Sequence, residues 1–131
     1  MPAAVIEVRR QYSPDESSAI IEAVHAALVE AFRIPEHDRN IRLVTHDPSQ
    51  FTCSPALEHP EFRTIVTIDC FVGRSLDAKR HLYRSVIDRL TALGIPGDRV
   101  STILHEIPLE NWGLGGGVAA ADADLGFALD V

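Results

Sequence analysis

The residue with the most unusual chemical potential is Pro2, because it directly follows the first methionine. Initiator methionine is normally removed before a small residue such as proline, and Pro2 would then carry a free secondary amine. Such an amine titrates at about pH 8 in a peptide, and both burial and a nearby arginine favour its neutral, basic form. The only side-chain amine that could do such chemistry belongs to Lys79, the single lysine in the chain. The Pro2 amine could serve as a general acid or base, although Pro2 could also be simply the second residue of an ordinary protein.

A second candidate is Arg74, which directly precedes the helix-capping residue Ser75. A cation is unfavourable at a helix N-terminus unless an anion lies nearby, and arginine suits two-pronged capture of a carboxylate. We therefore expect Arg74 to bind an anionic ligand, with support of the helix start as the structural alternative. The aromatic residues Phe71 and Trp112 are candidates for the wall of the same site, although Trp112 could equally anchor a subunit interface.

Two further polar residues have both a catalytic and a structural interpretation. Asp38 is a candidate for a catalytic role, but Asp38-Arg39 recurs as Asp98-Arg99, so a structural turn or ion pair is equally open. His25 lies between Ile21 and Leu28 on an apolar helical stripe. That position is also typical of a hydrogen-bonded core histidine.

The composition excludes several classes of protein. A net charge of −7 disfavours nucleic acid as a partner, and 46% apolar with 24% charged residues is typical of a globular chain. No apolar run approaches the roughly 20 residues that span a bilayer, and no leader opens the chain. Cys53 and Cys70 lack metal-ligand spacing, which favours a reducing, cytoplasmic setting. The histidines do not have the paired spacing of metal ligands, so no metal site is predicted. The glycine-rich stretch from Gly113 to Gly117 is not followed by the Lys-Ser or Lys-Thr of a phosphate loop.

The elements that must position these residues follow from periodicity and capping signals. Strands are predicted at 3–9, 41–46, 65–68 and 100–105. One helix begins after Ser13 and ends near Arg33, and the other begins after Ser75 and is ended by Gly94 and Pro96. The second helix carries an apolar stripe of Leu82, Val86, Ile87, Leu90 and Leu93. Residues 48–62 are predicted to be a linker or hairpin, and the tail from Pro108 has no clear pattern.

An approximate internal repeat organises these elements. The stretch from Ile34 to Pro48 resembles the stretch from Ile95 to Pro108, and each follows a similar strand and helix. We interpret residues 1–131 as one domain with pseudo-repeat halves of about 1–60 and 61–131. The predicted fold is α+β: a two-layer sandwich of two fused β-α-β units, with a four-stranded sheet and both helices on one face. The other face needs a cover, which predicts oligomerisation.

In combination, these features resemble the tautomerase superfamily, in particular its malonate semialdehyde decarboxylase-like and cis-3-chloroacrylic acid dehalogenase-like branch. The resemblance rests on Met1-Pro2 before a strand, Glu22-Ala23-Val24-His25, the stretch Ala31 to Arg39, Gly73-Arg74-Ser75, and Glu110-Asn111-Trp112-Gly113. It implies a fold like that of macrophage migration inhibitory factor, a homotrimer and no cofactor. It also implies catalytic Pro2, Asp38 and His25, with Arg74, Phe71 and Trp112 binding a small carboxylate substrate.

Departures from the family pattern guide the choice of activity. Relatives that decarboxylate or dehalogenate carry a second basic residue just before the arginine, where this chain has Phe71-Val72-Gly73. The decarboxylases also have arginines where this chain has Gly116 and Val118. We therefore expect a cofactor-independent keto–enol tautomerase of 2-keto acids such as phenylpyruvate. The alternatives are a malonate semialdehyde decarboxylase or hydratase, a dehalogenase of three-carbon acids, and a non-catalytic trimeric binding module.

Overall fold

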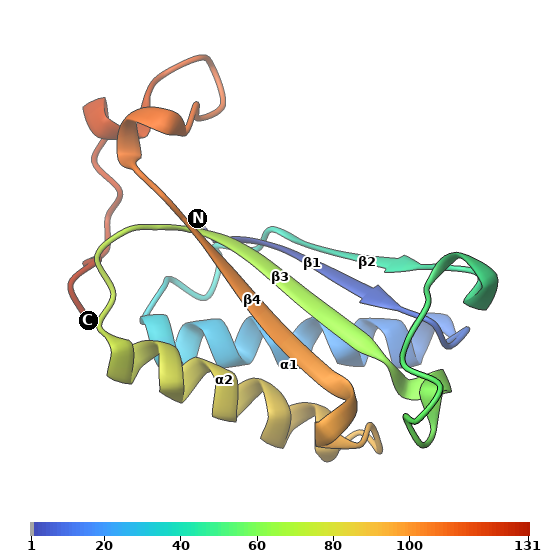
Figure 1. Cartoon of the computed structure of the whole chain (residues 1–131). Coiled ribbons are helices and arrows are strands. Elements are labelled where there is room, and N and C mark those ends of the chain that lie inside the picture. The colour runs from blue at the N-terminus through green and yellow to red at the C-terminus, as the bar shows by residue number, and fades with distance from the viewer. Residues whose placement is uncertain (1) are drawn as a thin grey trace.

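The chain folds into a four-stranded sheet with two helices packed on one side (Figure 1). The computed structural model describes residues 2–131. The elements in chain order are β1 (Ala3–Val8), α1 (Pro14–Phe32), β2 (Ile41–Thr45), β3 (Thr64–Phe71), α2 (Leu76–Thr91) and β4 (Val100–Ile107). Both helices lie under the sheet and contact each other, as the sequence predicts.

The sheet has the order β2-β1-β3-β4. Within each half the two strands run parallel, which confirms two β-α-β units. The halves meet through antiparallel pairing of β1 with β3, in which Ala3 lies opposite Asp69 and Val8 opposite Thr64. The start of β1 and the end of β3 therefore share one end of the sheet. That end holds the candidate site.

Helix α1 begins with the capping box that the sequence predicts. The Ser13 hydroxyl accepts a hydrogen bond from the Glu16 amide at 3.1 Å, and the Glu16 carboxylate accepts one from the Ser13 amide at 2.9 Å. These two bonds satisfy amides that have no partner inside the helix. At the other end, Arg33 adopts a left-handed conformation with φ of 54° and closes the helix before Pro35.

Helix α2 is capped by Ser75, whose hydroxyl accepts from the Ala78 amide at 3.1 Å. The helix ends at Thr91, whereas the predicted apolar stripe continues to Leu93. Leu93 is 45% exposed and does not belong to the buried face. The reason is local: the amides of Leu93 and Gly94 bond the carbonyls three residues earlier, and Gly94 turns the chain at a φ of +88°.

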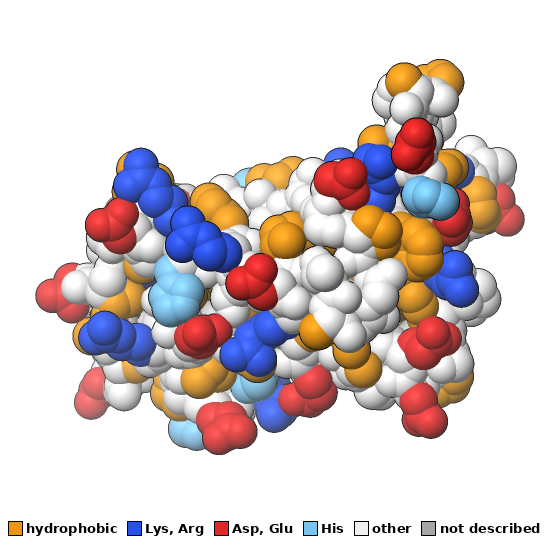
Figure 2. Space-filling view, turned by 90° about the horizontal axis from the view of Figure 1, so that it is seen from below, with side chains coloured by type: hydrophobic (Ala, Val, Ile, Leu, Met, Phe, Trp, Pro, Cys, Tyr) orange, Lys and Arg blue, Asp and Glu red, His pale blue; other side chains and the backbone are white. Residues whose placement is uncertain are grey.

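The core lies between the helices and one face of the sheet. Alternate residues of β1 and β3 point into it and are buried: Ala4, Ile6, Val8, Thr64, Val66, Ile68 and Cys70. The opposite face has no helix over it, and there Val44 and Ile103 are 41% and 45% exposed. On the outer surface of the helices, acidic and basic side chains are interspersed (Figure 2). Between the halves, residues 48–62 form two short 3₁₀ turns and no hairpin.

Candidate active site

The sheet end where β1 begins gathers most of the predicted site residues. Pro2 is buried and directly precedes β1. One further step of the antiparallel register beyond Ala3 and Asp69 brings Pro2 opposite Cys70, next to Phe71. Met1, whose removal would free the Pro2 nitrogen, lies outside the described residues. The topology thus brings Pro2 and the start of β1 beside the turn that carries Arg74.

The loop between α1 and β2 brings Asp38 toward the same end. Its amide donates to the Pro35 carbonyl at 3.0 Å, which closes a tight turn after the helix. Two residues later, the Asn40 carbonyl accepts a hydrogen bond from the Ala4 amide at 2.9 Å. Asp38 is half-buried. The loop that carries it is therefore joined to β1 two residues after Pro2.

Arg74 is the most unusual side chain in this region, because only 5% of it is exposed. It follows Gly73, whose φ of +132° turns the chain from β3 into α2. One guanidinium nitrogen, Nη1, donates to the Phe71 carbonyl at 3.3 Å. The guanidinium carbon lies 4.7 Å from the centroid of the Phe32 ring. Burial lowers the pKa of Arg74, an effect that Cys70 and Glu106 partly oppose.

The remaining edge of the guanidinium is unpaired. Nε and Nη2 are buried, and neither has a hydrogen-bond partner in the part of the chain that the structure describes. These two N–H groups point the same way and match the spacing of the two oxygens of a carboxylate. A buried cationic donor without an acceptor is costly, so this edge is expected to have a ligand. This buried, unpaired edge is therefore a candidate binding position for a carboxylate.

Two aromatic rings lie beside Arg74. The rings of Phe71 and Trp112 meet edge to face, with centroids 4.8 Å apart at an angle of 64°. Phe71 is fully buried at the end of β3, whereas Trp112 is half-buried and follows β4. Trp112 is held by its carbonyl, which accepts from the Ala120 amide at 2.9 Å. Phe71 therefore contacts Trp112 through its ring and the Arg74 guanidinium through its carbonyl.

His25 lies on α1 and contacts the loop before β2, the same loop that carries Asp38. Its side chain is 3% exposed, and Nε2 is 2.8 Å from the Glu36 carbonyl. A carbonyl can only accept, so Nε2 carries the proton. Nδ1 is buried and unpaired among the described residues. His25 thus ties α1 to the segment that leads into Asp38, two residues beyond Glu36.

Two residues near Arg74 escape recognition as site residues in the sequence. Phe32 appears there only as the last apolar residue of a helical stripe, and Phe127 falls in the tail that has no clear pattern. In the structure the guanidinium carbon of Arg74 lies 5.7 Å from the centroid of the Phe127 ring. The only available signal was an isolated aromatic residue in a stretch rich in Ala, Asp and Gly.

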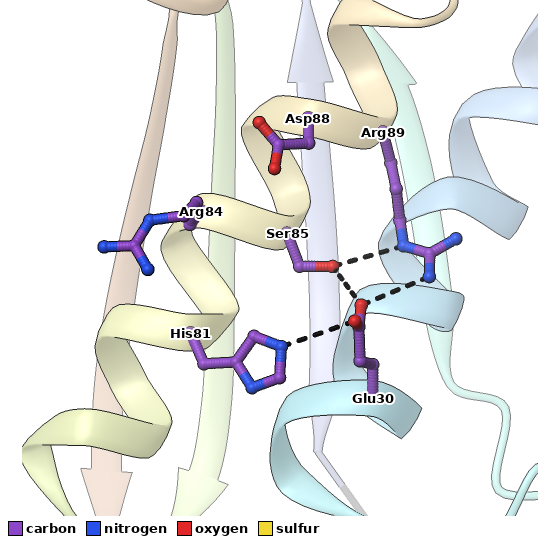
Figure 3. Close-up of a pocket in the computed structure, with 6 residues that line it drawn as sticks. All are labelled: Glu30, His81, Arg84, Ser85, Asp88 and Arg89. Carbon is purple, nitrogen blue, oxygen red and sulfur yellow. Dashed lines mark hydrogen bonds and ion pairs between the residues drawn. The ribbon is translucent and has the colours of Figure 1, made fainter.

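A separate groove of about 380 Å³ lies between the two helices and is lined by charged side chains (Figure 3). Its centre is Glu30, which accepts a hydrogen bond from the Ser85 hydroxyl at 2.7 Å and pairs with Arg89 at 3.2 Å and His81 at 3.4 Å. The Ser85 hydrogen bond is the largest cause that lowers the Glu30 pKa, to about 2. These groups satisfy one another's hydrogen-bonding capacity. We therefore interpret them as a polar network that links the two helices, and not as the active site.

Two other properties bear on the kind of site. Residues 2–131 contain no group of three or more histidine, cysteine or acidic side chains placed to hold a metal ion. In the same range, neither helix combines the length and apolarity needed to cross a bilayer.

A sequence profile described as "Tautomerase enzyme" matches residues 38–115, more than half of the chain. The chain belongs to this tautomerase family. The matched segment begins at Asp38 and includes Phe71, Arg74 and Trp112, but it contains neither Pro2 nor Phe127. A search of curated proteins finds no match.

Solved structures of tautomerase-superfamily members share the fold. FG41 malonate semialdehyde decarboxylase, inhibited by 3-bromopropiolate, is 28% identical over 88% of this chain and 91% of its own, with a TM-score of 0.77. A fused 4-OT, solved as an asymmetric trimer, is 17% identical over 91% of this chain and 96% of its own, with a TM-score of 0.81. N1, a member of the cis-3-chloroacrylic acid dehalogenase family, is 18% identical over 89% of this chain and 82% of its own, with a TM-score of 0.76.

Proposed function

We propose that the protein is a cofactor-independent keto–enol tautomerase of 2-keto acids with an aromatic side chain, such as phenylpyruvate. The observation that carries this proposal is the unpaired Nε–Nη2 edge of Arg74, buried at the sheet end where β1 begins. Family membership supplies the class of chemistry, and the Phe71–Trp112 pair supplies an apolar surface for the substrate's ring.

In the proposed reaction, Arg74 holds the substrate carboxylate by two parallel hydrogen bonds. Once Met1 is removed, the nitrogen of Pro2 accepts the proton of the enol hydroxyl on C2 of the substrate. It then returns a proton to C3, the neighbouring carbon of the enol double bond. One proton moves and no electrons are transferred, so the step needs no further reactant. Fixing the carboxylate places that carbon within reach of the amine, which lowers the entropic part of the barrier.

Asp38 and His25 have supporting roles in this proposal. Asp38 would orient the carbonyl of the substrate from the loop joined to β1. The contact of His25 with the Glu36 carbonyl favours an indirect role, in which it holds that loop in place. The catalytic assignment of both residues stays a prediction.

Arg74→Gln tests the carrying observation. Removal of a charge-assisted pair of hydrogen bonds to the substrate should lower kcat/KM for phenylpyruvate ketonisation roughly 100-fold, mainly through KM. Ultraviolet absorbance of the enol gives the rate. Arg84→Gln is the matched control, because Arg84 is exposed on α2 and the same charge is lost away from the site. Equal activity of both variants would contradict the role of Arg74.

Pro2→Ala tests the amine. A general acid–base group typically contributes 100-fold or more, so kcat should fall by roughly that factor. The intact mass of the natively started protein must also lack Met1, because a Pro2 amide has no basicity. Full activity of protein that retains Met1 would show that another group moves the proton, and full activity of Pro2→Ala would show that the secondary amine is not required.

Decarboxylation or hydration of malonate semialdehyde is the second candidate, favoured by the 28% identity to the FG41 decarboxylase. In that case Asp38→Asn should abolish carbon dioxide release from malonate semialdehyde. If the wild-type chain does not turn over this compound, the second candidate fails. If neither substrate class reacts, a non-catalytic binding module becomes the better account.

A further inference from the structure

The last twelve residues return to the turn between β3 and α2. In Figure 1 this last segment of the chain, drawn in red, runs back toward the start of α2. The Val131 carbonyl accepts a hydrogen bond from the Ser75 amide at 2.9 Å. A Cβ on Gly73 would lie 3.2 Å from the Cβ of Leu129, so the segment packs directly against the glycine before Arg74. These contacts place the end of the segment beside the turn that carries Arg74.

After a 3₁₀ turn at Ala120–Asp122, the segment keeps one side toward the body of the protein. Half-buried and exposed residues alternate along it. Ala123, Leu125, Phe127, Leu129 and Val131 are half-buried, and the residues between them are exposed, including Asp124 and Asp130. Phe127 packs against the hydrophobic core. The segment is therefore docked by its apolar side, with Phe127 as its aromatic contact.

Three groups restrict the orientation of the Arg74 guanidinium. The Phe71 carbonyl holds Nη1, and the rings of Phe32 and Phe127 lie 4.7 and 5.7 Å from the guanidinium carbon. Phe71 and Phe32 are fully buried parts of β3 and α1, whereas Phe127 belongs to the docked segment. A guanidinium held by a carbonyl and aromatic rings keeps its Nε–Nη2 edge in one direction.

We propose that Phe127 is a positioning residue that fixes the anion-binding edge of Arg74. This inference rests on the proposed function, because it assumes that this edge binds the substrate carboxylate. Without the ring, the guanidinium would sample more orientations and would lose more freedom when the substrate binds. The cost falls on substrate affinity and leaves the proton transfer at Pro2 unchanged.

The test compares Phe127→Leu, which removes the ring, with Phe127→Tyr, which keeps it. For phenylpyruvate, Phe127→Leu should raise KM roughly three- to tenfold and leave kcat within about twofold, while Phe127→Tyr restores the wild-type KM. Calorimetric titration with phenylacetate, a non-reacting carboxylate, should show the same loss of affinity. Leu125→Ala is the control, because it shortens another half-buried side chain of the segment.

Several outcomes would overturn the inference. If Phe127→Tyr weakens phenylacetate binding as much as Phe127→Leu does, docking of the segment matters and the ring's position over Arg74 does not. The same conclusion follows if Leu125→Ala weakens binding as much as Phe127→Leu does. Wild-type affinity in Phe127→Leu, together with lost binding in Arg74→Gln, would remove the role of Phe127 and leave the proposed function standing. If wild-type protein binds phenylacetate but ketonises no enol, the proposed function fails while the binding data still test Phe127.

Discussion

At the scale of single residues, the structure separates charged groups that are already paired from one that is not. Glu30, His81, Ser85 and Arg89 complete one another's hydrogen bonds between the helices. Arg74 is more deeply buried, yet its Nε and Nη2 lack partners among the described residues. Burial without a partner is unfavourable for stability, so the contrast favours a structural role for the first group and a ligand for the second.

The Glu30 network predicts a pH dependence of stability. The pKa of Glu30 falls from 4.5 to about 2 on folding, so its contribution is complete above pH 4.5 and is lost as the pH falls toward 2. Glu30→Gln should therefore unfold at a lower urea concentration than wild type at pH 7, and the difference should narrow between pH 4.5 and 2. Glu58→Gln is the control, because Glu58 is exposed and pairs with no described residue. A pH-independent difference would contradict the assignment.

At the scale of elements, the sequence predicts most of the fold because its helix signals are local. Ser13 with Glu16, and Ser75, cap the helices as predicted, and the strands appear within a few residues of the predicted bounds. The pairing of β1 with β3 could not be predicted, because it joins strands about 60 residues apart. The contact of Phe127 with Arg74 could not be predicted either, because an irregular tail has no periodicity from which its packing partners could be inferred.

The capping box makes a prediction for α1. Ser13→Ala removes the acceptor of the Glu16 amide and should destabilise the fold by about 1 kcal/mol, measured by urea unfolding at fixed protein concentration. Ser18→Ala is the matched control, because Ser18 is exposed inside the same helix, where alanine is the better helix former. Equal stability of the Ser13 variant and wild type would mean that another group satisfies this amide.

At the scale of the whole molecule, the open face of the sheet predicts self-association. Val44 and Ile103 remain more than 40% exposed there. We expect a homotrimer in which this face is covered. Ile103→Asp should shift the sedimenting species toward the monomer, whereas Leu76→Asp, at an exposed leucine on α2, should not. A monomeric wild-type protein would contradict the prediction.

The antiparallel junction of the two halves also sets the stoichiometry of the site. The start of β1 and the start of β3 lie at opposite ends of the sheet, and only β1 begins next to the chain's first residues. At the other end, β3 follows Arg63 through an ordinary peptide bond, and Arg9 holds the connecting loop through the carbonyls of Pro48 and Pro60. The two similar halves therefore provide only one position for the amine proposed at Pro2. A reagent that modifies this amine should titrate to one equivalent per chain, however symmetrical the two halves are.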